Sequence, residues 1–177
     1  PLLAAARYGH AESVADLAAA PADVDARASG GRRALAIAAA EGHEAAVRAL
    51  LEHGADANAT DTEQRTPLAW AASHGSVETV RLLIGAGARV DAPDQDGDTP
   101  LLHATRAGRS DAARQLLESG ANPAAQVKDR EPALCLALRS ASSAIAAALL
   151  DRGASVETRC ADGSPVLARA AASGDAV

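Results

Sequence analysis

The sequence repeats itself every 33 residues, and this strict period limits what the chain can fold into. The glycine that closes each leucine-rich segment (LLEHGAD, LLIGAGA, LLESGAN, LLDRGAS) recurs at this step, at Gly54, Gly87, Gly120 and Gly153. A leucine preceded by Pro, Ala or Val recurs as well, at Leu2, Leu35, Leu68, Leu101, Leu134 and Leu167. No insertion or deletion shifts the phase. A fixed period of this length is typical of repeat proteins, in which each unit buries its apolar face against its neighbours.

Within one unit the residues predict two short helices joined by tight turns. Thr66 can cap the first helix through its hydroxyl group, and Pro67 takes the first helical position, where a missing N–H does no harm. Gly75 allows the left-handed residue that ends this helix. The polar stretch at 91–98 (DAPDQDGD) supplies the turn before the next unit. The apolar positions at helical spacing are Leu68, Ala71 and Ala72 in the first helix and Val77, Val80, Leu83 and Ile84 in the second.

The composition excludes several classes of protein. Of all residues 48% are apolar, but the chain has no Phe or Met and one Trp, so its core must consist of Ala, Leu, Val and Ile. Small side chains of this kind let helices stack closely. A net charge of −6 argues against a surface that binds nucleic acid, which would be strongly basic. No apolar run approaches the ~20 residues that span a membrane.

The two cysteines, Cys135 and Cys160, do not form a metal-type pair such as Cys-x-x-Cys. We interpret Cys135 as a small buried apolar residue and expect Cys160 to be exposed in a loop. Two isolated thiols are typical of a reducing compartment. We therefore expect an intracellular protein, either in its own cytoplasm or delivered into another cell.

The repeated unit resembles the ankyrin repeat. The family pattern D-x-x-G-x-T-P-L-H-x-A-A-x-x-G-H, followed by a Val and Leu-Leu helix and by G-A-D-x-N, is similar to DQDGDTPLLHATRAG and to EGHEAAVRALLEHGADAN. The resemblance covers essentially the whole chain as one domain of six units: 1–27, 28–60, 61–93, 94–126, 127–159 and a partial 160–177. It implies an all-α repeat solenoid, a stack of helix pairs whose β-hairpin loops project to one side. Because both ends stop inside a unit, we expect a fragment of a longer array.

The fifth unit departs from the family pattern. Arg130 stands at the place of the loop glycine, and Ala141 at the place of the inner glycine. Pro132 replaces the capping threonine, as Pro165 does in the last unit. Because the stability of an array is roughly a sum of neighbouring terms, we expect these units to be less regular at the loop and less stable.

The resemblance also implies where a partner binds. In the family, variable loop positions and one face of each first helix line a concave groove. The helix position between the frame residues runs Ala4, Ile37, Trp70, His103, Leu136 and Arg169. We expect the partner-binding residues to be Arg32, Ile37, Arg65, Trp70, Ser73, His74, Asp96, Asp98, His103, Arg106, Glu131 and Leu136.

Trp70 supports two interpretations. It shares a helical face with Ser73 and His74, and tryptophan is enriched among the residues that dominate binding energy, which favours an anchor for a partner. Alternatively, the indole covers Ile37 and His103 between adjacent units and serves packing alone.

The charged loop positions change sign along the chain. The early positions are Arg32, Arg33 and Arg65, and the later ones are Asp94, Asp96, Asp98, Asp129 and Glu131. A groove of this polarity would orient an elongated partner of opposite polarity. Alternatively, the loop tips are polar because they are solvated.

These patterns predict a monomeric protein–protein interaction module that binds a partner protein without catalysis and without a cofactor. They favour no small-molecule substrate, nucleic acid, membrane or metal. The alternative is a regulatory or targeting segment of a larger enzyme, channel or secreted effector whose active domain lies outside this chain. Catalysis within the array is disfavoured because the sequence shows no nucleophile elbow, no phosphate loop, no His-Glu-x-x-His motif and no carboxylate–histidine cluster outside the repeat frame.

Overall fold

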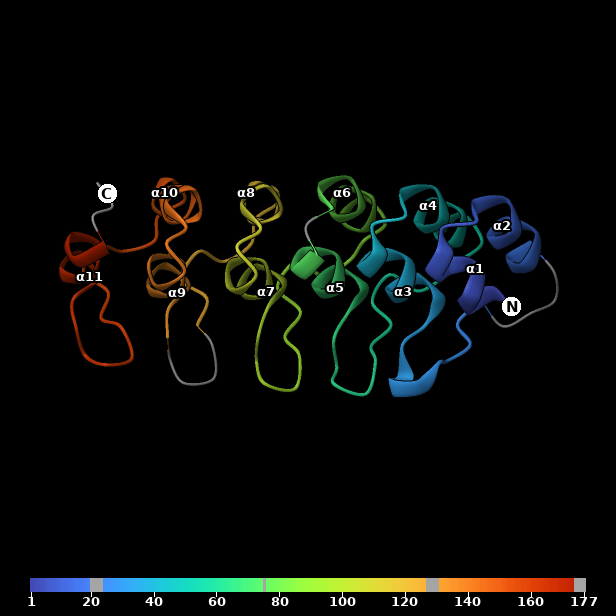
Figure 1. Cartoon of the computed structure of the whole chain (residues 1–177), viewed down its shortest axis with the longest axis horizontal. Coiled ribbons are helices and arrows are strands. Elements are labelled where there is room, and N and C mark those ends of the chain that lie inside the picture. The colour runs from blue at the N-terminus through green and yellow to red at the C-terminus, as the bar shows by residue number, and fades with distance from the viewer. Residues whose placement is uncertain (20–23, 75, 127–130, 174–177) are drawn as a thin grey trace.

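The computed structural model describes residues 1–19, 24–74, 76–126 and 131–173, and it shows an elongated stack of helix pairs in two rows (Figure 1). The inner row contains α1 (Leu2–Tyr8), α3 (Ala34–Glu41), α5 (Pro67–His74), α7 (Pro100–Arg106), α9 (Ala133–Arg139) and α11 (Val166–Ser173). The outer row contains α2 (Ala11–Ala19), α4 (Glu44–Glu52), α6 (Val77–Gly85), α8 (Ser110–Glu118) and α10 (Ser143–Asp151). A single 3-10 turn, η1 (Ser29–Gly31), precedes α3. The predicted all-α solenoid is confirmed.

The loops between helix pairs project from the inner row to one side of the stack, as Figure 1 shows. They are hairpin-like turns closed by isolated bridges, and the described part of the chain contains no extended strand. Neighbouring loops are joined through their backbones: the N–H of Thr62 donates to the carbonyl of Gly30 at 3.1 Å, and that of Gln95 donates to Glu63 at 2.9 Å. The loops at 28–32, 61–65 and 94–98 are therefore linked to one another by hydrogen bonds.

The first helices begin where the sequence predicts. The hydroxyl oxygen of Thr66 accepts from the N–H of Ala69 at 3.2 Å, and Thr99 accepts from Leu102 at 3.5 Å. Pro132, which stands at the threonine position, gives α9 no side-chain cap, yet the helix still starts at the next residue. Helix formation there comes from packing in the stack, which commonly outweighs local signals. The predictions for Gly75 and Arg130 fall on residues outside the described ranges.

The core is one continuous aliphatic cluster that runs the length of the stack. It includes the predicted frame residues Leu68, Ala71, Ala72, Val80 and Leu83, all of which are fully buried. Burial of a leucine or valine side chain stabilises the fold by about 1.5–3 kcal/mol, so the repeated frame supplies most of the driving force.

Ala141 keeps the backbone of the glycine that it replaces. Its φ is 51°, in the left-handed region, and the equivalent Gly108 and Gly42 have φ values of 66° and 74°. The inner turn of the fifth repeat is thus regular, but it is made by a residue for which this conformation is strained.

Candidate functional site

Trp70 lies on α5 at the side of the stack that carries the loops. Its Nε1–H donates to Oδ2 of Asp61 at 2.9 Å. The other oxygen of this buried carboxylate accepts from the backbone N–H groups of Glu63 and Arg65, at 2.9 and 3.0 Å. Asp61 therefore ties the loop to the indole and fixes the ring, which remains half-buried.

Two arginines from successive loops lie on the indole. The guanidinium carbons of Arg32 and Arg65 are 5.0 and 5.2 Å from a ring centroid of Trp70, within the range of a cation–π interaction. The three side chains line a recess of about 240 Å³ between the loops. The other lining residues are Ser29, Gly30, Asp61, Thr62 and Glu63.

Ser73 and His74 lie against the same indole, as their helical spacing predicts. The hydroxyl of Ser73 donates to the carbonyl of Trp70, and Nδ1 of His74 lies 2.9 Å from that oxygen. The imidazole of His74 is exposed, with its centroid 5.9 Å from the indole. These residues extend the exposed aromatic surface along α5.

His103 makes the equivalent contact one repeat later. Its Nε2 lies 2.9 Å from Oδ2 of Asp94, while Oδ1 accepts from the N–H groups of Asp96 and Asp98. Burial lowers the pKa of His103 below its usual value, so at neutral pH a neutral ring donates its Nε2–H. Burial opposes ionisation of Asp94, but the backbone hydrogen bonds from Asp98 and Asp96 outweigh it and lower the pKa of that carboxyl.

The sequence holds a signal for this pairing that the motif analysis missed. The loop residue nine positions before the variable helix position changes together with it. It is Asp where the helix carries Trp70 or His103, whose rings donate an N–H, and it is apolar where the helix carries Ile37 or Leu136. The pairs are Ala28 with Ile37, Asp61 with Trp70, Asp94 with His103, and Val127 with Leu136. The change from Trp to His is therefore tolerated because either ring satisfies the loop aspartate.

Five of the expected partner-binding residues are buried in the array, so they offer little surface to a partner. Ile37, Leu136 and His103 are 3%, 2% and 7% exposed, and His103 is also hydrogen-bonded to Asp94 of its loop. Asp98 and Glu131 are 4% and 3% exposed and are held by arginines of the inner helices. The expected residues that retain exposed or half-buried side chains are Arg32, Arg65, Trp70, Ser73, His74, Asp96 and Arg106.

These ion pairs also bear on the predicted polarity of the loop row. Arg106 lies 2.5 Å from Oδ2 of Asp98, and Arg169 donates to Glu131 at 2.9 Å. Arg139 lies 4.0 Å from the same glutamate. Two of the later acidic positions, Asp98 and Glu131, are thus paired with arginines that follow them in the sequence.

Asp94, Asp98 and His103 form a buried cluster of residue types that can hold a metal, with ligand atoms within 4.8 Å of one another. The sequence motifs do not reveal this cluster, because Asp94 and His103 are nine residues apart and meet only in the folded repeat. However, Arg65 lies 3.5 Å from Asp94, and Arg106 contacts Asp98, so both carboxylates already have a cationic neighbour. This charge balance fits a brace that holds the loop against α7, and the residues do not fit a divalent cation.

Comparison with known protein families agrees with this geometry. The profile described as Ankyrin repeats (3 copies) matches over residues 2–94, 54–127 and 85–160. The chain belongs to the ankyrin-repeat family. Ankyrin repeats generally serve as protein–protein interaction modules and are typically not catalytic. A comparison with curated proteins finds no match. Within the described ranges, no helix is both long enough and apolar enough to cross a membrane.

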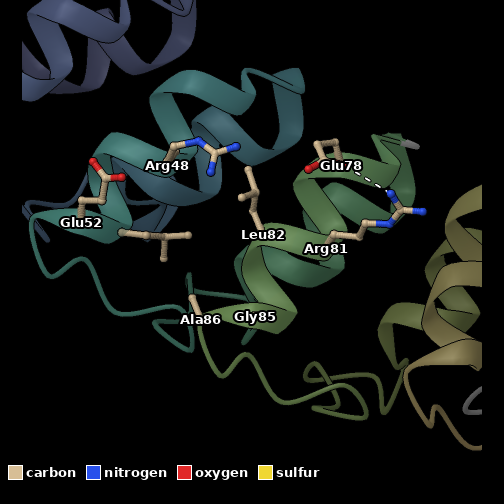
Figure 2. A pocket seen from close by; sticks show the side chains of 8 residues that line it. Arg48, Glu52, Glu78, Arg81, Leu82, Gly85 and Ala86 are labelled. Carbon is tan, nitrogen blue, oxygen red and sulfur yellow. Dashed lines mark ion pairs between the residues drawn. The ribbon is translucent and has the colours of Figure 1, made fainter.

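A second concavity of this ankyrin array lies on the outer row, away from the loops. It is a shallow hollow of about 350 Å³ between α4 and α6, lined by Leu51, Leu82 and charged residues of both helices (Figure 2). We call it the α4/α6 hollow. The sequence analysis did not predict it, because the family resemblance directs attention to the loop side.

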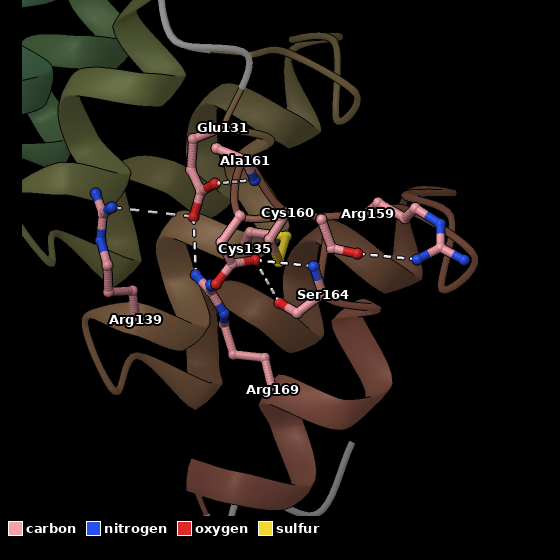
Figure 3. Close-up of a disulfide and its surroundings, with 10 residues drawn as sticks. Glu131, Cys135, Arg139, Arg159, Cys160, Ala161, Ser164 and Arg169 are labelled. Carbon is pink, nitrogen blue, oxygen red and sulfur yellow. Dashed lines mark hydrogen bonds and ion pairs between the residues drawn. A yellow bond between two sulfur atoms is a disulfide. The ribbon is translucent and has the colours of Figure 1, made fainter.

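The last ankyrin loop is tied to the preceding repeat by a disulfide. Cys135 on α9 and Cys160 before α11 are bonded and buried (Figure 3). The expectation of two isolated thiols with Cys160 exposed is wrong, so the cysteines no longer favour a reducing compartment. The two residues are 25 positions apart, and stacking of repeats brings their Cα atoms to 5.6 Å.

Glu131 lies beside the disulfide and makes polar contacts with the loop before α11 and with α11 itself. Its carboxylate accepts from the N–H of Ala161 at 2.6 Å and from Arg169 at 2.9 Å (Figure 3). Arg169 also reaches Asp162 at the tip of the same loop. Cys160 occupies the loop position that Asp61 and Asp94 hold in earlier repeats, so a disulfide replaces the aspartate brace at this end.

Proposed function

We propose that this ankyrin array binds a partner protein through the recess around Trp70, and that it does so without chemical turnover. The observation that carries the proposal is the state of Arg32. Its guanidinium lies on the indole, but among the described residues it has no carboxylate partner. By contrast, Arg65 lies 3.3 Å from Glu63 and 3.5 Å from Asp94.

An uncompensated guanidinium beside a rigid aromatic ring favours an acidic group of the partner. Tryptophan and arginine are the residue types most enriched at binding hot spots. The indole is held in place before binding by Asp61, so little side-chain entropy is lost when a partner contacts it. We infer that a carboxylate of the partner pairs with Arg32 while an adjacent apolar group covers the exposed part of Trp70.

Absence of turnover is supported by the chemistry of the recess. The carboxylate of Asp61 is occupied by three N–H donors, and Glu63 is paired with Arg65. Neither group is free to act as a general base, and Thr62 donates its hydroxyl to the carbonyl of Gly30. The recess therefore offers recognition groups without an activated nucleophile.

A paired capture experiment tests this function. The wild-type chain and its Trp70→Ala variant are used as baits in lysate, and retained proteins are compared by mass spectrometry. Tyr8→Ala serves as the matched control, because Tyr8 is another exposed aromatic side chain (69%) but lies on α1, two repeats before Trp70 and outside the lining of the recess. We expect a protein that is retained by the wild type and the control and lost with Trp70→Ala. Equal retention by all three folded baits would contradict the proposal.

A further inference from the structure

Three buried side chains of types that bind metals meet where the last repeat packs on the one before it. The ligand atoms of Glu131, Cys135 and Cys160 all lie within 4.8 Å of one another. Cys135 is on α9, Glu131 is in the loop before α9, and Cys160 is in the loop before α11 (Figure 3). The group therefore joins two repeats, and the chain has no other cysteine.

The two sulfur atoms become ligands only when their bond is broken, because each is bonded to the other in the disulfide. A thiol reductant breaks this bond by supplying two electrons and two protons, while two molecules of the reductant join as a disulfide. Cys135 and Cys160 are then thiols beside the carboxylate of Glu131. All three residues are buried, so a metal held there would be shielded from competing ligands in solution.

The types of ligand indicate which metal ion fits. Thiolates are ligands of soft or borderline ions such as Zn²⁺, whereas Mg²⁺ and Ca²⁺ take oxygen ligands. Zn²⁺ binds four ligands in a tetrahedron and accepts both thiolate sulfur and carboxylate oxygen. Two sulfur atoms and one oxygen of Glu131 would fill three of these positions, and a water molecule would fill the fourth.

The charges around the three residues also fit a divalent cation. Glu131 is paired with Arg169 at 2.9 Å, and the solvent-exposed Arg139 comes only to 4.0 Å. The carboxylate is thus compensated, and two thiolates would add two negative charges, which a divalent cation balances. The cluster around Asp94 differs in this respect, because its two carboxylates already face two arginines and it has no thiolates.

The loop before α11 allows the two sulfur atoms to separate around an ion. Zn–S bonds are about 2.3 Å long, so the sulfur atoms must move apart from their bonded positions. Cys135 is fixed on α9, but Cys160 lies in a turn whose tip, 161–163, is exposed. The N–H of Ala161 and the guanidinium of Arg169 donate to Glu131 and orient its carboxylate toward the sulfur atoms.

We propose that reduction of the disulfide converts this interface into a Zn²⁺ site, with the thiolates of Cys135 and Cys160 and the carboxylate of Glu131 as ligands. Binding of the ion releases the two thiol protons to solvent. A low-molecular-weight disulfide reverses the change: it takes up the two electrons, the sulfur–sulfur bond forms again, and Zn²⁺ leaves. The last repeat is thus held by a covalent bond or by a metal ion, according to the redox state of its surroundings.

Titration of the whole chain with Zn²⁺ tests the proposal. The chain is reduced with a thiol, which is then removed without access of air, and the oxidised chain is titrated in parallel. Calorimetry in two buffers of different ionisation enthalpy gives the affinity, the stoichiometry and the number of protons released. We expect one Zn²⁺ per reduced chain with release of about two protons, and no binding to the oxidised chain. Co²⁺, used as a spectroscopic probe, should give a charge-transfer band from thiolate to metal.

Variants of the ligands separate this site from binding elsewhere on the surface. Cys160→Ser should abolish the binding of Zn²⁺. Glu131→Gln still accepts hydrogen bonds from Ala161 and Arg169, and it should weaken binding roughly tenfold or more. Glu157→Gln, which removes the same charge from an exposed side chain of the same repeat, is the matched control and should bind as the wild type does. Circular dichroism checks that each variant is folded.

The proposal is overturned if the reduced chain takes up no Zn²⁺, or if the oxidised chain or Cys160→Ser binds it as tightly as the reduced wild type. Equal affinities of Glu131→Gln and the wild type would overturn the assignment of the carboxylate as a ligand. Loss of binding in His103→Gln but not in Cys160→Ser would place the ion in the Asp94 cluster and would also overturn the proposal.

Discussion

Trp70 and His103 each direct a ring N–H toward a buried loop aspartate nine residues earlier. The two side chains differ in how much of the ring is exposed to solvent. The larger indole remains half-exposed between Arg32 and Arg65, whereas the imidazole is buried. The same position of the repeat thus contacts the loop aspartate in both cases. Only Trp70 also leaves part of its ring exposed.

Burial of His103 makes the stability of the array depend on pH. Because its pKa is lowered in the fold, the unfolded chain binds more protons than the folded chain once the pH falls through the ordinary value of 6.5. The stabilisation is complete above that pH and is lost as the pH falls toward the lowered pKa. The lowered pKa of Asp94 adds a further loss below about its ordinary value of 3.8.

Urea unfolding at pH 7 and pH 5 checks this for the wild type and for His103→Gln, which keeps an N–H donor but does not titrate. We expect the wild type to lose more unfolding free energy than the variant between these two pH values. The other four histidines are present in both proteins, so their contribution cancels in the difference. An equal loss in both proteins would show that His103 is not the group responsible.

Ala141 holds a left-handed backbone conformation that costs an L-residue about 1–2 kcal/mol. We therefore expect Ala141→Gly to raise the free energy of unfolding by about 1 kcal/mol, after the greater flexibility of glycine in the unfolded chain is deducted. The matched control is Gly108→Ala at the equivalent position, where a Cβ meets no atom within 4 Å. It should destabilise by a similar amount, and thermal unfolding measures both. A stability that falls in Ala141→Gly would contradict this reading of the turn.

The helices themselves were predictable because their signals are local and recur in every repeat. Thr66 and Thr99 cap as expected, and the apolar frame is buried as the helical spacing indicates. The disulfide was not predictable, because Cys135 is on a helix and Cys160 is in the loop of the next repeat. No spacing rule joins two such positions until the repeats are stacked, and the burial of Ile37 and Leu136 escaped prediction for the same reason.

Reduction of the disulfide should loosen the terminal repeat before the rest of the array. A cross-link that closes a loop of 25 residues is expected to stabilise by about 3 kcal/mol. Because the disulfide joins α9 to the loop before α11, this stabilisation acts mainly on that loop and α11. Hydrogen exchange with and without a reducing agent measures the effect, and amides of 160–173 should lose protection.

The double variant Cys135→Ser, Cys160→Ser is the control for reduction, since it should behave like the reduced wild type and not respond to the reducing agent. Loss of protection spread evenly over all repeats would contradict the local role of the disulfide. Unchanged protection in 160–173 would show that the ion pairs of Glu131 hold this end without the covalent link.

At the scale of the whole molecule, the sequence predicts the stack but not the distribution of its charge. The change of sign along the loop positions is real in the sequence, yet Arg106, Arg139 and Arg169 on the inner helices neutralise Asp98 and Glu131. In the recess around Trp70, Arg65 is paired with Glu63, and Arg32 has no carboxylate partner among the described residues. The α4/α6 hollow on the outer row is separate from this recess.

We propose that a partner protein binds the array through the recess formed by Arg32, Arg65 and Trp70. The most direct test is the dissociation constant of the captured partner for the wild type, for Arg32→Glu and for Arg114→Glu, by titration calorimetry. Arg114 is an exposed arginine of the outer helix α8 and controls for the change in net charge. We predict that Arg32→Glu weakens binding at least tenfold, equivalent to about 1.4 kcal/mol or more, while Arg114→Glu leaves it unchanged. Equal dissociation constants for all three proteins would contradict the claim.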